Sequence, residues 1–303
     1  MIRTVAPFVR TGIDKILLMR QGINNMRIEN LQNENRRFVK SIGNFHVLEY
    51  VQDASVSPMN AMNEYFMSKM NVRRRQVVID IDKDHSAIIQ AGAMQWMGGN
   101  VRATSGVKGI GDLLGKALKG AVTKETVVKP EYVGEGCLVL EPTYKYIILA
   151  DINKWGPAGM TIEDGMFLAC DGNVKSNVVA RKTLSSAVLG GEGLFNLSLQ
   201  GNGVAALESN VPEDELIEVV LENDELKIDG NLAVCWSSNL EFTVERSTKT
   251  LVGSAVSGEG LVNVYRGTGR VLMCPVAPTT SLFESTNTTA AKAAAKFSNT
   301  FGK

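Results

Sequence analysis

Residues 191–204 read GEGLFNLSLQGNGV, a short alternating run held between two pairs of glycines. Asn196 and Ser198 alternate with Leu197 and Leu199, which places polar and apolar side chains on opposite faces of an extended chain. Glycines at both ends suit the turns between strands, because those turns favour positive φ. The stretch therefore predicts a β-strand between two turns.

The same order of signals occurs three times along the chain. Gly-Glu-Gly starts at Gly134, Gly191 and Gly258, and a strand-like run follows each unit. Asp-Gly pairs also precede the apolar runs that end at Cys170 and Cys235. Self-similarity on this scale indicates one β unit present in three copies. The predicted copies are residues 76–151, 160–211 and 225–276.

The recurring glycines are predicted to serve backbone geometry at turns. A phosphate-binding loop would require a Lys-Ser/Thr pair and the start of a helix after the glycines, and neither follows them. The glycines in question are Gly134, Gly136, Gly191, Gly193, Gly201, Gly203, Gly258, Gly260, Gly267 and Gly269.

The predicted fold class is all-β, with three tandem antiparallel β-sandwich-like units. Short helices are expected near the N-terminus and in an insertion at 107–121. Four segments follow: an amphipathic helical extension at 1–25, strands and a Met-rich helix at 26–75, the β domain at 76–276, and an Ala/Thr/Lys-rich tail at 277–303.

Individual elements can be placed from short patterns. Apolar runs predict strands at 45–51, 77–81 and 146–150. Spacings of three and four residues predict a short Met-faced helix within 58–70. Its methionine and aromatic positions are Met59, Met62, Phe66, Met67 and Met70.

Two regions carry a family resemblance. The run at 90–97, QAGAMQWM, followed by Gly-Asn-Val at 99–101, resembles a signature of the Altered Inheritance of Mitochondria 24 family. Later signatures of that family are similar, in the same order, to residues 164–170, 191–203 and 258–271.

The resemblance implies a fold similar to the tryptophan RNA-binding attenuation protein, with units repeated around a pseudo-threefold axis. It also implies homotrimers and a bacterial member of the family, and it brings no catalytic residue. The first 25 residues and the Ala-Lys tail have no counterpart in the family core.

Charge gives no support for nucleic acid as a partner. Lys and Arg total 32 and so do Asp and Glu, so the net charge is zero. Residues 1–76 hold twelve basic and six acidic side chains, whereas 212–230 is strongly acidic. These opposite patches can pair within or between subunits.

The sequence offers no catalytic set, so we expect neither an enzyme nor a bound metal or cofactor. Only His46 and His85 are present, and no Gly-x-Ser-x-Gly motif occurs. His85 lies in a polar turn and His46 on a strand. The four cysteines are far apart and none forms a CxxC pair, which favours reduced, buried thiols in the cytoplasm.

Five residues are candidates for binding. The rings of Trp96 and Trp236 could stack on a ligand between units, or fill the core or an interface. The other three, Glu135, Glu192 and Glu259, recur in the Gly-Glu-Gly units. They suit a structural role at a turn or unit boundary, or a ligand site lined by carboxylates.

The sequence therefore predicts a non-enzymatic, homo-oligomeric scaffold or binding protein. One alternative is a small-molecule-binding β ring with sites between units. Another is an organiser at a membrane surface that uses residues 5–20, whose apolar residues have helical spacing and whose polar side is basic. The same helix could instead dock into the oligomer.

Overall fold

The computed structural model describes residues 26, 28–104, 129–180, 182–183, 195–246 and 261–277. The predicted helices at 5–20 and 107–121 lie outside these residues, as does the tail from residue 278 onward. So do six of the predicted site residues, which make up the two later Gly-Glu-Gly units: Gly191, Glu192, Gly193, Gly258, Glu259 and Gly260.

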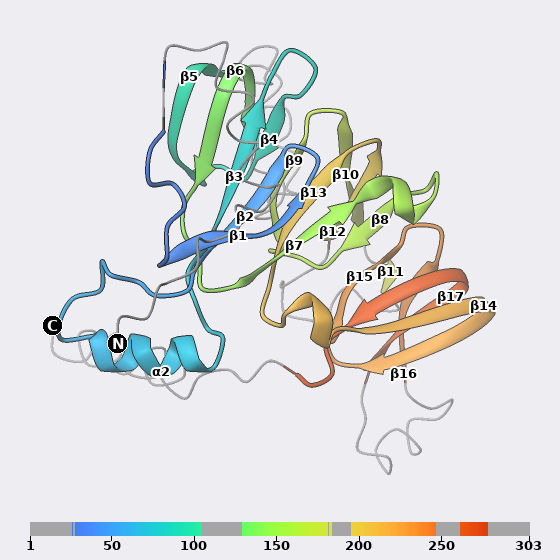
Figure 1. Cartoon of the computed structure of the whole chain (residues 1–303). Helices are drawn as coiled ribbons and strands as arrows, with labels where there is room; N and C mark the ends of the chain where they lie inside the picture. The colour runs from blue at the N-terminus through green and yellow to red at the C-terminus, as the bar shows by residue number, and fades with distance from the viewer. Residues whose placement is uncertain are drawn as a thin grey trace, which may run out of the picture.

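The first sheet is antiparallel and curls on itself (Figure 1). Its strand order is β1-β2-β3-β6-β4-β9-β13-β7, and β5 also pairs with β6. The last strand, β7, approaches both β1 and β3 within 8 Å between Cα atoms, so the sheet is barrel-like. The strands are β1 (Arg36–Ile42), β2 (Phe45–Tyr50), β3 (Arg75–Ile81), β4 (Ala87–Ile89), β5 (Met94–Thr104), β6 (Glu131–Leu140), β7 (Tyr146–Asp151), β9 (Phe167–Asp171) and β13 (Val204–Ser209).

The second sheet follows the order β10-β12-β8-β15-β17-β16-β11, and β14 pairs with β17. Its pairs are antiparallel except for β11 with β16. The strands are β8 (Met160–Ile162), β10 (Val174–Ala180), β11 (Lys182–Thr183), β12 (Phe195–Gly201), β14 (Ile217–Asp229), β15 (Ala233–Ser237), β16 (Glu241–Arg246) and β17 (Leu261–Met273).

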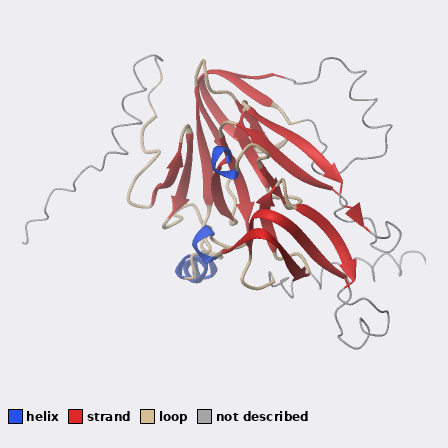
Figure 2. Cartoon of the chain, turned by 90° about the vertical axis from the view of Figure 1, so that its right-hand side faces the viewer, coloured by secondary structure: helices blue, strands red, loops and turns tan. Residues whose placement is uncertain are grey.

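Helical structure among the described residues is confined to connections. The α2 helix (Ala61–Lys69) joins β2 to β3 and lies apart from both sheets (Figures 1 and 2). Two short 3-10 turns, η3 (Ile152–Trp155) and η4 (Glu213–Glu215), precede β8 and β14. The described part of the chain is thus mostly β, as the sequence predicts.

The middle of the chain holds the two sheets together. β9 belongs to the first sheet and continues into β10 of the second, and β12 of the second continues into β13 of the first. Apolar side chains from both sheets pack at this junction, including Phe167, Leu199 and Cys235. A separate core fills the first sheet around Phe45 and Leu138.

The strands predicted at 45–51, 77–81 and 146–150 correspond to β2, β3 and β7. The strand predicted within 191–204 is β12, and both of its faces are buried. Asn196 and Ser198 are as buried as Leu197 and Leu199. Ser198 Oγ finds a partner 3.1 Å away in Ser238 Oγ.

Glycine is required at two positions of β6 that lie against the backbone of β5. Gly134 has φ +125°, and a Cβ there would lie 1.9 Å from the carbonyl oxygen of Asn100. A Cβ on Gly136 would lie 2.0 Å from the carbonyl oxygen of Gly98. These two positions therefore need glycine both for backbone conformation and for space.

We predict that Gly134→Ala lowers the free energy of unfolding by about 3 kcal/mol or more, because strain at positive φ adds to a backbone clash. Gly92 is the matched control, since it has φ +82° but no atom within 4 Å of an added Cβ. Gly92→Ala should cost only the conformational strain, about 1–2 kcal/mol. Urea unfolding of both variants measures the difference, and equal midpoints would contradict the proposed clash.

Candidate functional site

Among the described strands, β5 and β14 have an unpaired edge next to apolar side chains, as do β1 and β10 at the ends of the two sheets. The first half of β5, from Met94 to Gly98, pairs with β6 only. Along β14, the run from Asp224 to Asp229 pairs with β17 only. Met97 is exposed and Leu226 partly exposed. Open edges of this kind offer unpaired backbone N–H and C=O groups to another strand.

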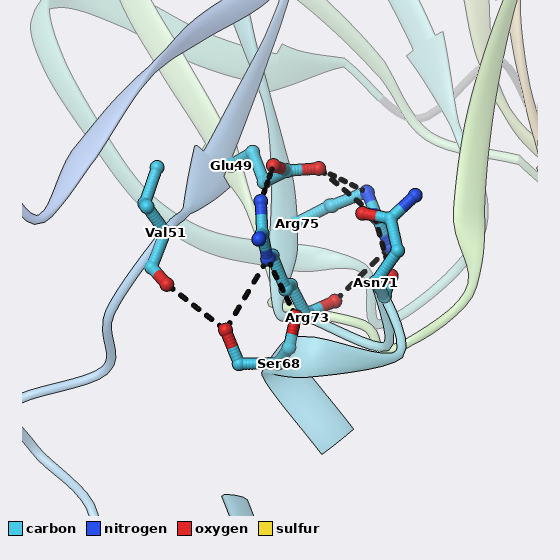
Figure 3. A network of polar contacts seen from close by, with 6 residues as sticks. All are labelled: Glu49, Val51, Ser68, Asn71, Arg73 and Arg75. Carbon is cyan, nitrogen blue, oxygen red and sulfur yellow. Dashed lines mark hydrogen bonds and ion pairs between the residues drawn. The ribbon is translucent and has the colours of Figure 1, made fainter. Parts of the chain in front are cut away.

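A buried ion pair fixes the connection that carries α2 (Figure 3). The Glu49 carboxylate on β2 lies 2.8 Å from Arg73 Nη1 and 2.8 Å from Arg75 Nη2. The Arg75 side chain is only 4% exposed and that of Glu49 10% exposed. Their interaction is therefore poorly screened by solvent.

The same two arginines reach the end of α2. Arg75 Nη2 donates to the Asn71 carbonyl oxygen at 3.0 Å, and Arg73 Nε donates to that of Ser68 at 3.2 Å. Ser68 Oγ donates in turn to the carbonyl oxygen of Val51 at 3.0 Å. The helix is thus attached to β2 and β3 through polar contacts (Figure 3).

A cavity of about 460 Å³ lies between α2 and the end of β2. Its lining includes Tyr50, Asp53 and Tyr65. Arg74 Nε lies 2.8 Å from Asp53 Oδ2 on one side of it. The cavity separates the helix from the strands, which leaves polar contacts to hold the helix in place.

A second, polar cavity of about 500 Å³ lies where β5 and β6 meet the turn between β9 and β10. Asn100 and Glu135 line it from one side and Asn173 from another. Asp82 and Asp84 complete the acidic lining. Among the described residues, no three His, Cys, Asp or Glu side chains lie close enough together to hold a metal ion.

Residues 69–276 match the model of the family described as mitochondrial biogenesis AIM24. The chain belongs to the AIM24 family. A relative from Streptococcus pyogenes serotype M6, described as uncharacterised, is 29% identical over 203 residues, covering 64% of this chain and 79% of its own length. The AIM24 chain thus has a bacterial relative, which agrees with the bacterial membership expected from the sequence.

A crystal structure of another Streptococcus pyogenes protein has the same fold, with a TM-score of 0.51. It is 24% identical and covers 73% of this chain and 94% of its own. Neither description states an activity, so the comparisons define the family and the fold of the AIM24 chain.

The two candidate tryptophans have different surroundings in this AIM24 protein. Trp236 is 2% exposed and packs against Phe242 and Tyr265, with ring centroids 5.4 and 5.2 Å away. Trp236 therefore packs in a core, which is one of the roles expected for it. Trp96 is partly exposed on β5 and packs beside a cluster that contains Phe38 and Cys137.

Of the three candidate glutamates, Glu135 is the one that the structure describes. It lines the polar cavity, and Lys83 Nζ lies 3.7 Å from its Oε1. The Glu49 ion pair could not be predicted from the sequence, because its partners come from separate elements. The one available signal is the run of three arginines at 73–75, which belongs to the basic excess of residues 1–76.

The remaining reactive side chains have structural surroundings. All four cysteines are buried as free thiols, as predicted. Burial raises the pKa of Cys137 and of Cys170 to about 12. His46 is buried, with Nδ1 2.8 Å from Ser41 Oγ, and His85 Nδ1 lies 2.7 Å from Asp82 Oδ1 within its turn. No helix in the described ranges is long and apolar enough to cross a membrane.

We predict that Glu49→Gln lowers the free energy of unfolding by about 3–5 kcal/mol, because it leaves the buried Arg75 guanidinium without its counter-ion. Glu218→Gln is the matched control, since Glu218 Oε1 pairs with Arg270 Nη1 at 3.0 Å on the surface. That variant should cost at most about 1 kcal/mol. Urea unfolding measures both, and a small loss for Glu49→Gln would mean that water reaches Arg75.

Proposed function

We propose that this protein acts by assembling with itself into a homotrimeric β ring that serves as a scaffold, and that it carries out no catalysis. The observation that carries the proposal is the pair of open strand edges on β5 and β14. In this proposal each chain contributes three equivalent β units, and the open edges join one copy to the next.

The pairing of the described strands supports three units. Three Gly-x-Gly triplets begin at Gly134, Gly201 and Gly267, at intervals of 67 and 66 residues (134 to 201 and 201 to 267). Each first glycine has positive φ; Gly134 and Gly267 lie within long strands, and Gly201 ends β12. Gly134 pairs with Val101 and Gly201 with Val174, and a Gly-Asn pair precedes both valines.

This alignment replaces the one based on the repeated Gly-Glu-Gly. In the third unit Asn239-Leu240 corresponds to Asn100-Val101 and Asn173-Val174. Leu240 Cδ2 lies 3.6 Å from where a Cβ on Gly267 would be. Only the first Gly-Glu-Gly, at Gly134, belongs to the aligned triplets. The Gly-Glu-Gly units at Gly191 and Gly258 then resemble each other because each comes just before a strand, β12 or β17.

Short strands join neighbouring units within the chain. β4 pairs with β6 on one side and with β9 on the other. β8 likewise pairs with β12 on one side and with β15 on the other. The corresponding third strand is the second half of β14, which pairs with β17 and has no strand on its other side among the described residues.

The two internal junctions define a register for the proposed junction between copies. Ala87 pairs with Asp171, and Met160 pairs with Ser237. At the proposed junction between copies, Leu226 on β14 corresponds to Ala87 and Met160, and Gly98 on β5 corresponds to Asp171 and Ser237. The register therefore places Leu226, Lys227 and Ile228 opposite Gly98, Met97 and Trp96 of the next copy.

Head-to-tail contacts of this kind form closed rings when the rotation between copies closes. The resemblance to the AIM24 family implies closure at three copies. Edge pairing would also cover Met97 and Trp96, which otherwise remain partly exposed. The four free, buried thiols suit the reducing environment of the cytoplasm, which we include in the proposal.

A ligand-binding ring is the second candidate function. The polar cavity supports it, because Glu135 and Asn100 from the first unit face Asn173 from the second across that space. A cavity of about 500 Å³ is large enough for a small polar molecule. Its carboxylate lining favours a cationic ligand.

The register predicts the effect of a charge swap. Met97→Lys should place a second lysine opposite Lys227 and lower the mass in solution from three chains toward one chain of 32.8 kDa. Met97→Lys combined with Lys227→Glu should restore the larger mass. Light scattering behind a sizing column measures both variants.

Val178→Lys is the matched control, because Val178 is equally exposed on β10 but lies away from the proposed junction. It should leave the mass unchanged. A wild-type protein that is monomeric at micromolar concentration would contradict the assembly, and failure of the charge swap would contradict the register.

For the second candidate, native mass spectrometry of protein purified from its own cells should show an added mass that Glu135→Gln reduces. Glu241→Gln, on an exposed position of β16, should keep that mass. A single mass equal to that of the chain would count against a retained ligand.

A further inference from the structure

The α2 helix directs its apolar side chains away from the protein. None of its residues is buried. Met62 is 73% exposed, Phe66 60% and Met70, at its end, 76%. These residues follow one another at intervals of four, so they lie along one face of the helix. We call Met59, Met62, Phe66 and Met70 the outer face of α2.

The opposite face of α2 holds the helix through polar groups. Glu64 and Ser68 lie on that face, which turns toward the strands. Tyr144 OH donates to Glu64 Oε1 at 2.5 Å, and Ser68 Oγ donates to the Val51 carbonyl oxygen. An amphipathic helix normally buries its apolar stripe against its own protein. Here the polar face is attached, so the apolar face is available to another partner.

The size of the outer face argues against a stable protein partner. A helix of nine residues is about 13 Å long and about 10 Å across. A strip of that size is far smaller than the roughly 800 Å² per partner that stable protein interfaces bury. A lipid bilayer sets no such requirement, because a few large apolar side chains can insert between headgroups without a complementary surface.

Positive charge lies beside the outer face. Lys69 is exposed at its edge, where it also borders the cavity between α2 and β2, and its Nζ lies 5.2 Å from the centroid of the Tyr65 ring. A lysine in this position can place its stem among apolar groups and its ammonium at the headgroups. Beyond the helix Arg75 is buried in its ion pair with Glu49, so Lys69 supplies the exposed positive charge. Anionic headgroups complement this arrangement.

We propose that α2 is a lipid-docking element that inserts its outer face into the surface of an anionic bilayer. Met62 and Phe66 supply the apolar insertion, and Lys69 contacts the phosphate groups of the lipids. The Glu49 ion pair keeps the helix at a fixed angle to the sheets. Docking by this helix is separate from pairing at β5 and β14, so it does not depend on ring assembly.

The test is flotation of the full chain with vesicles of phosphatidylcholine, with or without phosphatidylglycerol at equal total lipid. The wild-type protein should float with the anionic vesicles and much less with the neutral ones. Met62→Ser combined with Phe66→Ser should weaken binding about tenfold or more, because two large apolar contacts are lost. Lys69→Ser should reduce the difference between the two vesicle types.

Val178→Ser combined with Val179→Ser is the matched control, since both valines are exposed on β10, away from α2. This control should float like the wild type. Circular dichroism and the thermal midpoint confirm that each variant is folded. No flotation of the wild type would overturn the proposal, leaving a protein partner for the outer face. Unchanged flotation of Met62→Ser with Phe66→Ser would also overturn it and assign lipid binding to another segment, such as residues 5–20.

Discussion

This fold depends on two very short strands that supply the backbone hydrogen bonds between longer strands. β4 and β8 contain three residues each, yet each lies between two longer strands and joins them. Without β4, the strands from β1 to β6 would lose their link to β9. Buried Ile89 and Ile162 fill the apolar space at these links, so packing and hydrogen bonding coincide there. The edge left open on β14 follows from the same dependence, because no further unit follows β17 within the described chain.

Much of the local structure could be predicted because it depends on short sequence patterns. Strand-length apolar runs located β2, β3 and β7, and methionine spacing located α2. Burial was harder to predict, because alternation in β12 says which residues share a face and not what covers that face. Asn196 and Ser198 are buried by strands that come from other parts of the chain. Spacing in α2 likewise groups Met62 with Phe66 without saying that their face turns outward.

The candidate site depends still more on distant contacts. Trp236 is an obvious candidate in the sequence, but its neighbours Phe242 and Tyr265 make it part of a core. Glu49 attracts no attention in the sequence, although it neutralises a deeply buried arginine. The proposed equivalence of Gly134 with Gly201 also depends on strand pairing, since the repeated Gly-Glu-Gly triplet suggests another alignment. In each case the decisive information is which residues meet, and a single sequence carries little of it.

The burial of all four cysteines has a practical consequence for studies of motion in this protein. A thiol with a raised pKa is almost fully protonated at neutral pH, and the protonated form reacts poorly with maleimides and iodoacetamide. The native chain therefore gives little background in thiol labelling. One cysteine introduced on an exposed strand would carry a spin label or fluorophore at a single known place. Distances across the molecule would thus be measurable without first removing the natural cysteines, which would leave cavities in the core.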